Sequence, residues 1–130
     1  MNPSNNTSAF NILVAEDNFT NQVILEKILQ AAGWQVKTAL NGRQALEYLA
    51  QQTFDLVLMD WQMPVMDGLT ATREIRNSKA AWAQIPVIGI TGNSSADKRS
   101  RCLAAGMNDV MAKPVNRQQL TEMINSFLVG

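Results

Sequence analysis

Five short, largely apolar runs, each followed by a segment with helical periodicity, constrain the fold of this chain more than any other feature. The runs span residues 12–15, 34–39, 54–59, 86–90 and 110–112. Short runs rich in β-branched residues are typical of strands buried on both faces, as in a parallel sheet. Strands that alternate with helices predict an α/β fold in which right-handed crossovers place helices on both faces of the sheet.

The intervening segments have the apolar spacing and the end signals of helices. The pattern predicts helices over residues 18–32, from Asn41, over residues 68–78, over residues 95–105 and from Asn116. In the first helix we expect Ile24, Ile28 and Ala31 to face the core, flanked by Leu25 and Leu29. Asn116 is expected to cap the last helix, with Gln119 at the third position of a capping box.

The length of 130 residues fits one domain, which can bury a core without disulfides. Residues 1–10 are predicted to form a disordered N-terminal tail, because most of them are Asn, Ser and Thr. Residues 11–130 then form the folded domain. The polar start of the chain is not typical of a signal peptide, and no apolar run approaches the roughly 20 residues of a membrane span.

Charge and cysteine content narrow the classes of partner and compartment. Eleven basic and eleven acidic residues cancel, so charge favours no direct contact with nucleic acid or with an anionic membrane. The single Cys102 cannot form an intramolecular disulfide, which favours a reducing compartment, and we expect a cytoplasmic location. The sequence has no histidine, so any phosphohistidine chemistry requires a second protein.

Polar side chains follow four of the five predicted strands. Glu16 and Asp17 follow the first run, Asp60 the third, Thr91 the fourth and Lys113 the fifth. Ligands of doubly wound sheets bind beyond the carboxyl ends of the strands, near the point where the strand order reverses. In a sheet of strand order 2-1-3-4-5 these four ends are contiguous. The sequence therefore predicts one polar site at this edge.

Each of these residues alone is better explained as a helix cap, a turn residue or a solvated side chain, but together they favour phosphoryl transfer. Three carboxylates held close together repel, so a cation between them or a bound proton is expected. Oxygen ligands without Cys or His favour Mg²⁺ or another hard divalent ion such as Mn²⁺. A carboxylate such as Asp60 can attack phosphorus, while Lys113 and Thr91 contact the phosphoryl oxygens.

These residues lie in four segments that resemble the receiver domain of two-component response regulators. The segments read AEDN (residues 15–18), LVLMDWQMPVMDG (56–68), IPVIGITG (85–92) and AGMNDVMAKP (105–114). The resemblance extends over residues 11–129, and the order and spacing of its motifs are highly specific. The forms at residues 16–18 and 107–109 are more similar to receivers of hybrid sensor histidine kinases than to those of DNA-binding regulators.

The resemblance implies a flavodoxin-like, doubly wound (βα)5 fold with a five-stranded parallel sheet of order 2-1-3-4-5. It implies that Asp60 is the phosphoacceptor. It further implies that Asp17 ligates Mg²⁺ directly and Glu16 directly or through water, with Asp60 and the backbone carbonyl of Gln62 completing the protein ligands.

The same resemblance implies roles for residues around the phosphoacceptor. Thr91 would hydrogen-bond the phosphoryl group and shift toward it, and Lys113 would pair with the phosphoryl group or the aspartates. The bond between Lys113 and Pro114 is expected to be cis. Gly68 is expected to allow a positive φ in the loop after Asp60.

One position departs from the pattern of similar domains. They often place an aromatic residue three positions before the lysine, and this ring moves inward when the threonine moves; here the position holds Val110. Valine cannot move a ring in this way. We therefore expect switching to use only the loop after Thr91 and the fourth helix, whose residues 94–100 are polar and weakly helical.

The resemblance implies a histidine kinase or a histidine phosphotransfer protein as phosphodonor, with acetyl phosphate as a small-molecule substitute, and it leaves homodimer formation on phosphorylation open. One alternative is an Asp-nucleophile phosphatase, but those enzymes carry Asp-x-Asp and this chain has Gln62 at the second position. We therefore expect slow self-dephosphorylation and no turnover of external substrates.

Another alternative, a binding module that has lost phosphorylation, is disfavoured because all five site residues are present.

Tryptophan and basic residues remain outside these motifs. Packing is the simplest role for Trp34, Trp61 and Trp82. Lys98, Arg99 and Arg101 form a basic cluster on the predicted fourth helix, and this cluster is either a solvated face or a docking surface for a partner.

Overall fold

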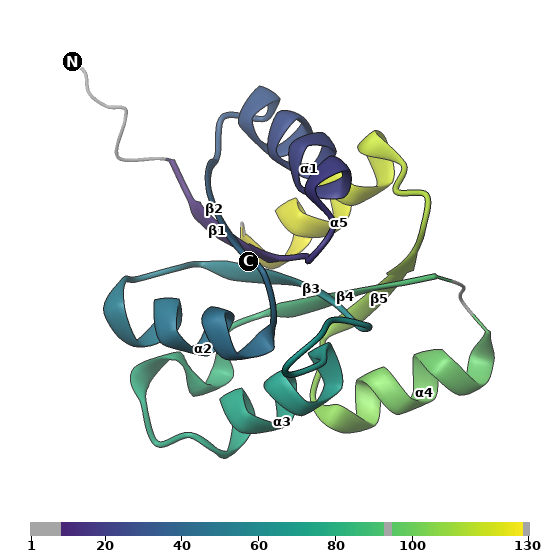
Figure 1. Cartoon of the computed structure of the whole chain (residues 1–130). Coiled ribbons are helices and arrows are strands. Elements are labelled where there is room, and N and C mark those ends of the chain that lie inside the picture. The colour runs from purple at the N-terminus through teal and green to yellow at the C-terminus, as the bar shows by residue number, and fades with distance from the viewer. Residues whose placement is uncertain (1–8, 93–94, 129–130) are drawn as a thin grey trace.

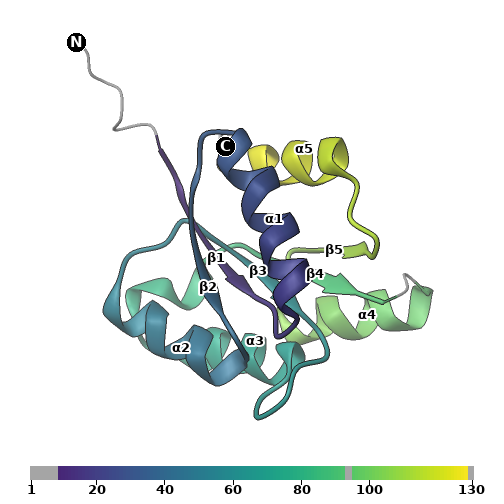
Figure 2. The same cartoon turned by 45° about the horizontal axis from the view of Figure 1, so that its top comes forward.

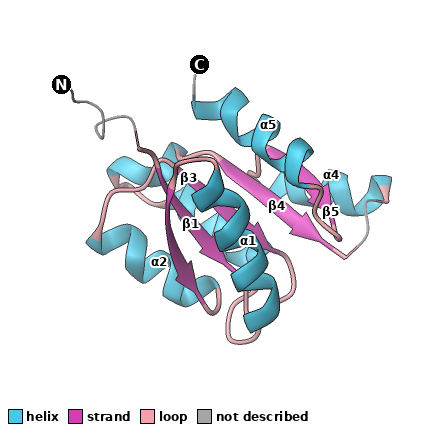
Figure 3. Ribbon diagram, turned by 90° about the horizontal axis from the view of Figure 1, so that it is seen from above, coloured by secondary structure: helices cyan, strands magenta, loops and turns pink. Residues whose placement is uncertain are grey.

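Five parallel strands form a single sheet in a computed structural model that describes residues 9–92 and 95–128. The strands are β1 (Asn11–Ala15), β2 (Gln35–Ala39), β3 (Leu56–Asp60), β4 (Val87–Thr91) and β5 (Asp109–Ala112). Their order is β2-β1-β3-β4-β5, and every neighbouring pair is parallel. The predicted order is confirmed, and the arrowheads in Figure 3 point the same way, so the strands end at one edge.

Helices cover both faces of this sheet. They are α1 (Phe19–Ala31), α2 (Gly42–Gln51), α3 (Gly68–Asn77), α4 (Ala96–Ala105) and α5 (Arg117–Leu128), with a 3-10 turn, η2 (Ala81–Gln84), before β4. Helices α1 and α5 lie on one face, and α2, α3 and α4 lie on the other (Figure 1). The predicted three-layer α/β architecture is therefore confirmed. None of the helices in the described ranges is long and apolar enough to cross a membrane.

Alternate residues of the central strands enter two separate cores. Leu13 of β1 packs in the core under α2, α3 and α4, whereas Ile12 and Val14 pack in the core under α1 and α5. All five residues of β3 and all five of β4 are buried. This double burial explains why these strands read as continuous apolar runs.

The second run, residues 34–39, was predicted to be buried on both faces, and this prediction is wrong. Strand β2 pairs only with β1, at one edge of the sheet (Figure 2). Gln35 and Lys37 are exposed, and only Ala39 is fully buried. An edge strand receives less cover from the flanking helices, so polar side chains alternate along it.

Side-chain caps begin each helix at the position that the sequence signals indicated. Asn18, Asn41, Asp67, Ser95 and Asn116 each accept a hydrogen bond from the backbone N–H three residues later. The cap satisfies a donor that has no partner within the helix. Asn116 thus caps α5 through Gln119, as predicted.

Helix α1 is rotated relative to the prediction. Leu25, Ile28 and Leu29 are buried, but Ile24 is 48% exposed and Ala31 is exposed. The buried stripe includes Gln22, which a hydrophobicity pattern omits because it is polar. Its side-chain amide donates to the backbone carbonyl of Glu16 at 2.6 Å, and this contact turns the helix toward the site.

The predicted tail lies mostly outside the described residues, which begin at residue 9. Phe10, the last residue assigned to the tail, packs against the core under α1 and α5. Its carbonyl accepts a hydrogen bond from the Gln35 N–H at 2.8 Å. Phe10 therefore contacts the folded domain.

Candidate functional site

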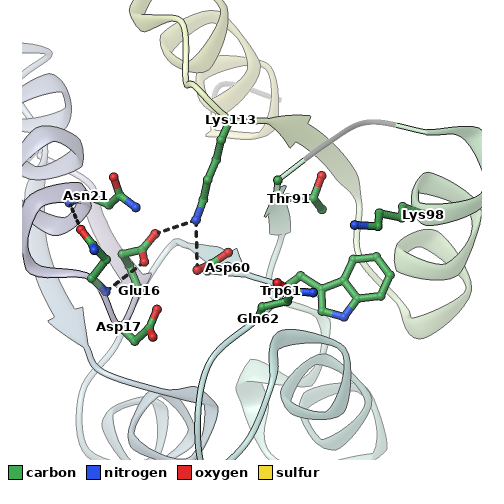
Figure 4. A pocket seen from close by; sticks show the side chains of 11 residues that line it. Glu16, Asp17, Asn21, Asp60, Trp61, Gln62, Thr91, Lys98 and Lys113 are labelled. Carbon is green, nitrogen blue, oxygen red and sulfur yellow. Dashed lines mark hydrogen bonds and ion pairs between the residues drawn. The ribbon is translucent and has the colours of Figure 1, made fainter.

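The carboxyl ends of four strands surround one polar pocket. Glu16 and Asp17 follow β1, Asp60 ends β3, Thr91 ends β4 and Lys113 follows β5. These side chains line a pocket of about 270 Å³ (Figure 4). The structure thus brings together all five side chains that the sequence singled out, and Gln62 lines the same pocket.

Three carboxylates converge on one side of the pocket. One oxygen each from Glu16, Asp17 and Asp60 lie within 4.8 Å of one another. Glu16 and Asp60 are 1% and 4% exposed, whereas Asp17 is exposed. Oxygen atoms at this spacing, with one of them open to solvent, suit a hard divalent cation that retains water ligands.

Lys113 is the cation that faces these carboxylates. Its ammonium lies 3.2 Å from Oδ2 of Asp60 and 3.5 Å from Oε1 of Glu16. The backbone N–H of Lys113 donates to the carbonyl of Thr91 at 2.7 Å, which ties the end of β5 to β4. The Lys113–Pro114 bond is cis, as predicted.

The turn between β1 and α1 holds Glu16 in place while one of its oxygens stays without a hydrogen bond. Oε2 of Glu16 accepts from the backbone N–H of Asn18 at 3.1 Å. Oε1 of Glu16 is buried and has no hydrogen-bond partner, although the charge of Lys113 lies near it. A buried carboxylate oxygen in this condition is well placed to ligate a cation.

Burial and charge act in opposite directions on Asp60. Burial, together with the neighbouring Glu16 charge, raises the pKa of Asp60 to about 6, although Lys113 opposes this rise. Burial also disfavours the charge of Lys113, but attraction to Asp60 and Glu16 prevails and raises the pKa of Lys113. The metal-free site therefore holds a protonated lysine beside a carboxylate that retains its proton more readily than usual.

The loop between β3 and α3 brings two backbone segments into close contact. Gly68 was expected to adopt a positive φ, and this prediction is wrong: in the described part of the chain, the non-glycine residue with a positive φ is Val65 of this loop, at 69°. Gly68 starts α3, and its N–H donates to the Trp61 carbonyl at 2.7 Å. A Cβ at Gly68 would overlap the carbonyl oxygen of Asp60, so glycine is needed here for close approach.

Val110, the residue that replaces the expected aromatic ring, is 7% exposed and packs in the core under α2, α3 and α4. The aromatic residue beside the site is instead Trp61, directly after Asp60. Two cations of α4 lie over its ring, Lys98 at 5.6 Å and Arg101 at 5.1 Å from the ring centre.

Sequence reasoning did not identify Asn18, Asn21 and Lys98 as pocket residues, although all three line the pocket. Asn18 caps α1, Asn21 lies in its first turn and Lys98 lies on α4, whereas the residues predicted for the site follow strand ends. A lysine in the first turn of the helix after β4 was the available signal for Lys98.

Comparison with known proteins assigns the chain to a family. The model for the response regulator receiver domain matches residues 12–125. The chain belongs to this family. This match confirms the resemblance that was inferred from the four sequence segments.

Curated relatives include sensor kinases and hybrid histidine kinases that are many times longer than this chain. The chain is 38% identical over 117 residues to the CAI-1 autoinducer sensor kinase/phosphatase of Vibrio cholerae, and the match covers 90% of the chain and 17% of the relative. It is 37% identical over 119 residues to hybrid signal transduction histidine kinase K of Dictyostelium discoideum, covering 87% of the chain and 10% of the relative. These relatives agree with the hybrid-kinase resemblance.

Solved receiver domains share the fold. The receiver domain of a sensor histidine kinase from Pseudomonas aeruginosa is 37% identical, with a TM-score of 0.87 and coverage of 95% of this receiver and 100% of that chain. That structure has a magnesium ion in its active-site cleft. The receiver domain of a Saccharomyces cerevisiae response regulator, solved with a histidine phosphotransfer protein, is 29% identical, with a TM-score of 0.84 and coverage of 93% and 90%.

Proposed function

We propose that this receiver domain accepts a phosphoryl group on Asp60 from a phosphohistidine of a partner protein, with Mg²⁺ or Mn²⁺ as cofactor. The observation that carries the proposal is the arrangement around Asp60, which is 4% exposed, lies beside the acidic pair Glu16 and Asp17, and has the Lys113 ammonium 3.2 Å away. A carboxylate between a cation site and an ammonium is positioned as a nucleophile toward phosphorus.

The residues present fit a divalent metal ion. Glu16, Asp17 and Asp60 provide oxygen atoms within 4.8 Å of one another, and Oε1 of Glu16 is buried without a hydrogen bond. The pocket also contains Gln62, whose backbone carbonyl we assign as a further ligand. When bound there, such an ion would supply positive charge that offsets the charge of the phosphoryl oxygens. The magnesium in the cleft of the Pseudomonas aeruginosa receiver supports this assignment.

The chain's own residues perform the transfer. A carboxylate oxygen of Asp60 forms the new P–O bond while the N–P bond of phosphohistidine breaks, and the electron pair of that bond remains on the imidazole. Lys113 compensates part of the charge of the phosphoryl oxygens, and the hydroxyl of Thr91 donates a hydrogen bond to one of them. No second carboxylate follows Asp60 at the position of Gln62, so hydrolysis of the product is slow and the domain acts as a switch.

An apolar groove beside the site gives the phosphodonor a place to dock. This groove, about 430 Å³, shares Glu16, Asn21 and Lys113 with the pocket and continues over Ile24 of α1 and Pro114. Because Lys113 lines both the groove and the pocket and contacts Asp60, we expect a histidine-bearing helix bound in the groove to reach the phosphoacceptor. We assign it to a histidine kinase or a histidine phosphotransfer protein, and the complex of the Saccharomyces cerevisiae receiver supports this choice.

Intact-mass spectrometry after incubation with acetyl phosphate and Mg²⁺ tests the proposal. We expect the wild-type chain to gain the mass of one phosphoryl group and the Asp60→Asn variant to gain none. Asp97→Asn is a matched control, because Asp97 is an exposed aspartate of α4 outside the pocket, and it should gain the group as the wild type does. Chelation of the metal should prevent the gain.

The proposal fails if the wild type never gains the phosphoryl mass or if Asp60→Asn gains it equally. A cytoplasmic location forms part of the same proposal, supported by Cys102, which is a free and buried thiol.

A further inference from the structure

Lys98 differs from the other residues at the start of α4. It is half-buried, whereas Ser95, Ala96, Asp97 and Arg99 are exposed. Its ammonium lies 5.6 Å from the centre of the Trp61 ring, and its side chain lines the same pocket as Asp60. In Figure 4 the ammonium of Lys98 points from α4 toward the site, on the side away from Glu16 and Asp17.

Other basic residues of α4 have different surroundings. Arg99 forms an ion pair with Asp109 of β5 at 2.9 Å. Arg101 lies over the Trp61 ring at 5.1 Å, but it does not line the pocket. Lys98 is thus the basic residue of α4 whose charge borders the phosphoacceptor site.

Phosphorylation of Asp60 changes the charge of the pocket. The reaction removes one carboxylate charge and adds a phosphoryl group that carries about two negative charges near neutral pH. The site therefore becomes more negative by about one charge. Lys113 already pairs with Asp60 and Glu16 before the reaction, so its charge is present in the site in both states and adds nothing on phosphorylation.

We propose that Lys98 is a phosphoryl-binding residue, which leaves the face of Trp61 and pairs with a phosphoryl oxygen once Asp60 is phosphorylated. This inference rests on the proposed function of the site. The four-carbon stem of lysine permits the movement without a large displacement of the helix, and an ammonium gains more from a phosphoryl dianion than from an aromatic face. Arg101 remains over the ring.

The movement links phosphorylation to α4 without an aromatic residue at position 110. The new ion pair draws the first turn of α4 toward the pocket, while the pair between Arg99 and Asp109 holds the helix to β5. Lys98, the side chain that binds the phosphoryl group, then belongs to α4, the helix that moves.

Binding of beryllofluoride, a phosphoryl mimic, tests this role in the presence of Mg²⁺. Trp34→Phe and Trp82→Phe leave Trp61 as the single tryptophan, so its emission reports binding. We expect Lys98→Met to bind the mimic about tenfold more weakly, because one charge-assisted contact is lost, and Lys98→Arg to recover part of the affinity. The affinity for beryllofluoride should fall more steeply with added salt in the protein that retains Lys98 than in Lys98→Met.

Arg101→Met is the matched control, because it removes the other cation from Trp61 and leaves Lys98 in place. It should bind beryllofluoride as the wild type does. Equal affinity of Lys98→Met and wild type, or an equal loss in Lys98→Met and Arg101→Met, would overturn the role of Lys98 alone. Failure of the wild type to bind the mimic or to gain phosphoryl mass would overturn the proposed function and this inference with it.

Discussion

At the residue scale, Asp60 lies in surroundings that disfavour its charge in the metal-free protein. Burial and the Glu16 charge outweigh Lys113 and hold the pKa of Asp60 at about 6. The folded state therefore binds a proton at Asp60 more tightly than the unfolded chain does. This contribution to stability is present below the ordinary aspartate pKa and is lost as the pH rises through 6.

Asp60→Asn should consequently stabilise the metal-free protein at alkaline pH. We expect the free energy of unfolding to rise by about 1–3 kcal/mol at pH 8, because the buried charge is removed. Near pH 5 the wild-type carboxyl is mostly protonated, so the two proteins should differ little. Urea unfolding with a metal chelator measures both values. An equal difference at the two pH values would contradict the assignment of this pKa to Asp60, and excess Mg²⁺ should reduce the advantage of the variant.

Whether a site residue could be predicted from the sequence depended on whether it lies at the end of a strand. Asp60, Thr91 and Lys113 could be predicted because parallel strands bring their carboxyl ends to one edge. Lys98 carried only a weak signal, its place in the first turn of the helix after β4, because its approach to the site depends on how α4 packs against Trp61. Gly68 was expected to allow a positive φ, but only the folded structure shows the actual reason for glycine, which is that a Cβ would overlap the Asp60 carbonyl.

At the element scale, α1 and α4 are suited to different tasks: α1 to binding a partner and α4 to moving when Asp60 is phosphorylated. Helix α1 exposes Ile24 beside the apolar groove, because the polar Gln22 takes part of the buried stripe. Helix α4 buries only Cys102 and Ala105, whereas α3 buries five residues. An element with few buried apolar contacts opens at low free-energy cost, and so it is suited to move.

Substitution of Ile24, an exposed apolar residue of α1 in the groove, should separate docking of the phosphodonor from phosphoryl transfer itself. Ile24→Glu places a charge in the groove, and we expect phosphoryl transfer from a histidine phosphotransfer protein to slow by about tenfold or more. Phosphorylation by acetyl phosphate should be unchanged, because that donor needs no groove. Leu103→Glu is the control, since Leu103 is a comparably exposed apolar residue of α4 at 39%. Similar losses with both donors would show that the groove is not the docking site.

Hydrogen exchange addresses the movement of α4. With a phosphoryl mimic bound, we expect amide protection to change between Gly92 and Ala105, because the end of β4 and α4 respond together. Residues 93–94 of this span lie outside the described residues. Amides of α2, which lies on the same face of the sheet, serve as an internal reference and should keep their protection (Figure 1). Unchanged exchange across α4 would contradict switching through this helix.

At the scale of the whole molecule, one arginine joins segments that are far apart in the sequence. Arg76 of α3 donates to the carbonyls of Gly106, Ala83 and Ile85 at 2.8–2.9 Å and to Oδ1 of Asn108 at 2.9 Å. The same Asn108 oxygen accepts from the backbone N–H of Val87 at 2.8 Å. This network connects α3, η2, β4 and the turn before β5 at the end of the sheet opposite the site.

Sequence patterns could predict the topology but not this network. The resemblance to receiver domains implied the strand order, in which the four polar strand ends lie side by side, and buried runs located the central strands. Partners of Arg76 are mostly backbone carbonyls, which carry no sequence signal, and they belong to loops whose positions depend on the finished fold. Edge strand β2 was misjudged for a different reason, because Gln35 and Lys37, which alternate along it, already indicated an exposed face.

Loss of Arg76 should destabilise the whole domain. Arg76→Ala leaves three backbone carbonyls without this donor, and we expect the free energy of unfolding to fall by about 2–4 kcal/mol. Arg76→Lys should recover only part of this loss, because an ammonium cannot reproduce the planar guanidinium geometry. Arg73→Ala changes an exposed arginine of the same helix and should alter stability by less than about 0.5 kcal/mol. Urea unfolding compares the three variants, and equal effects of Arg73→Ala and Arg76→Ala would refute a structural role for the network.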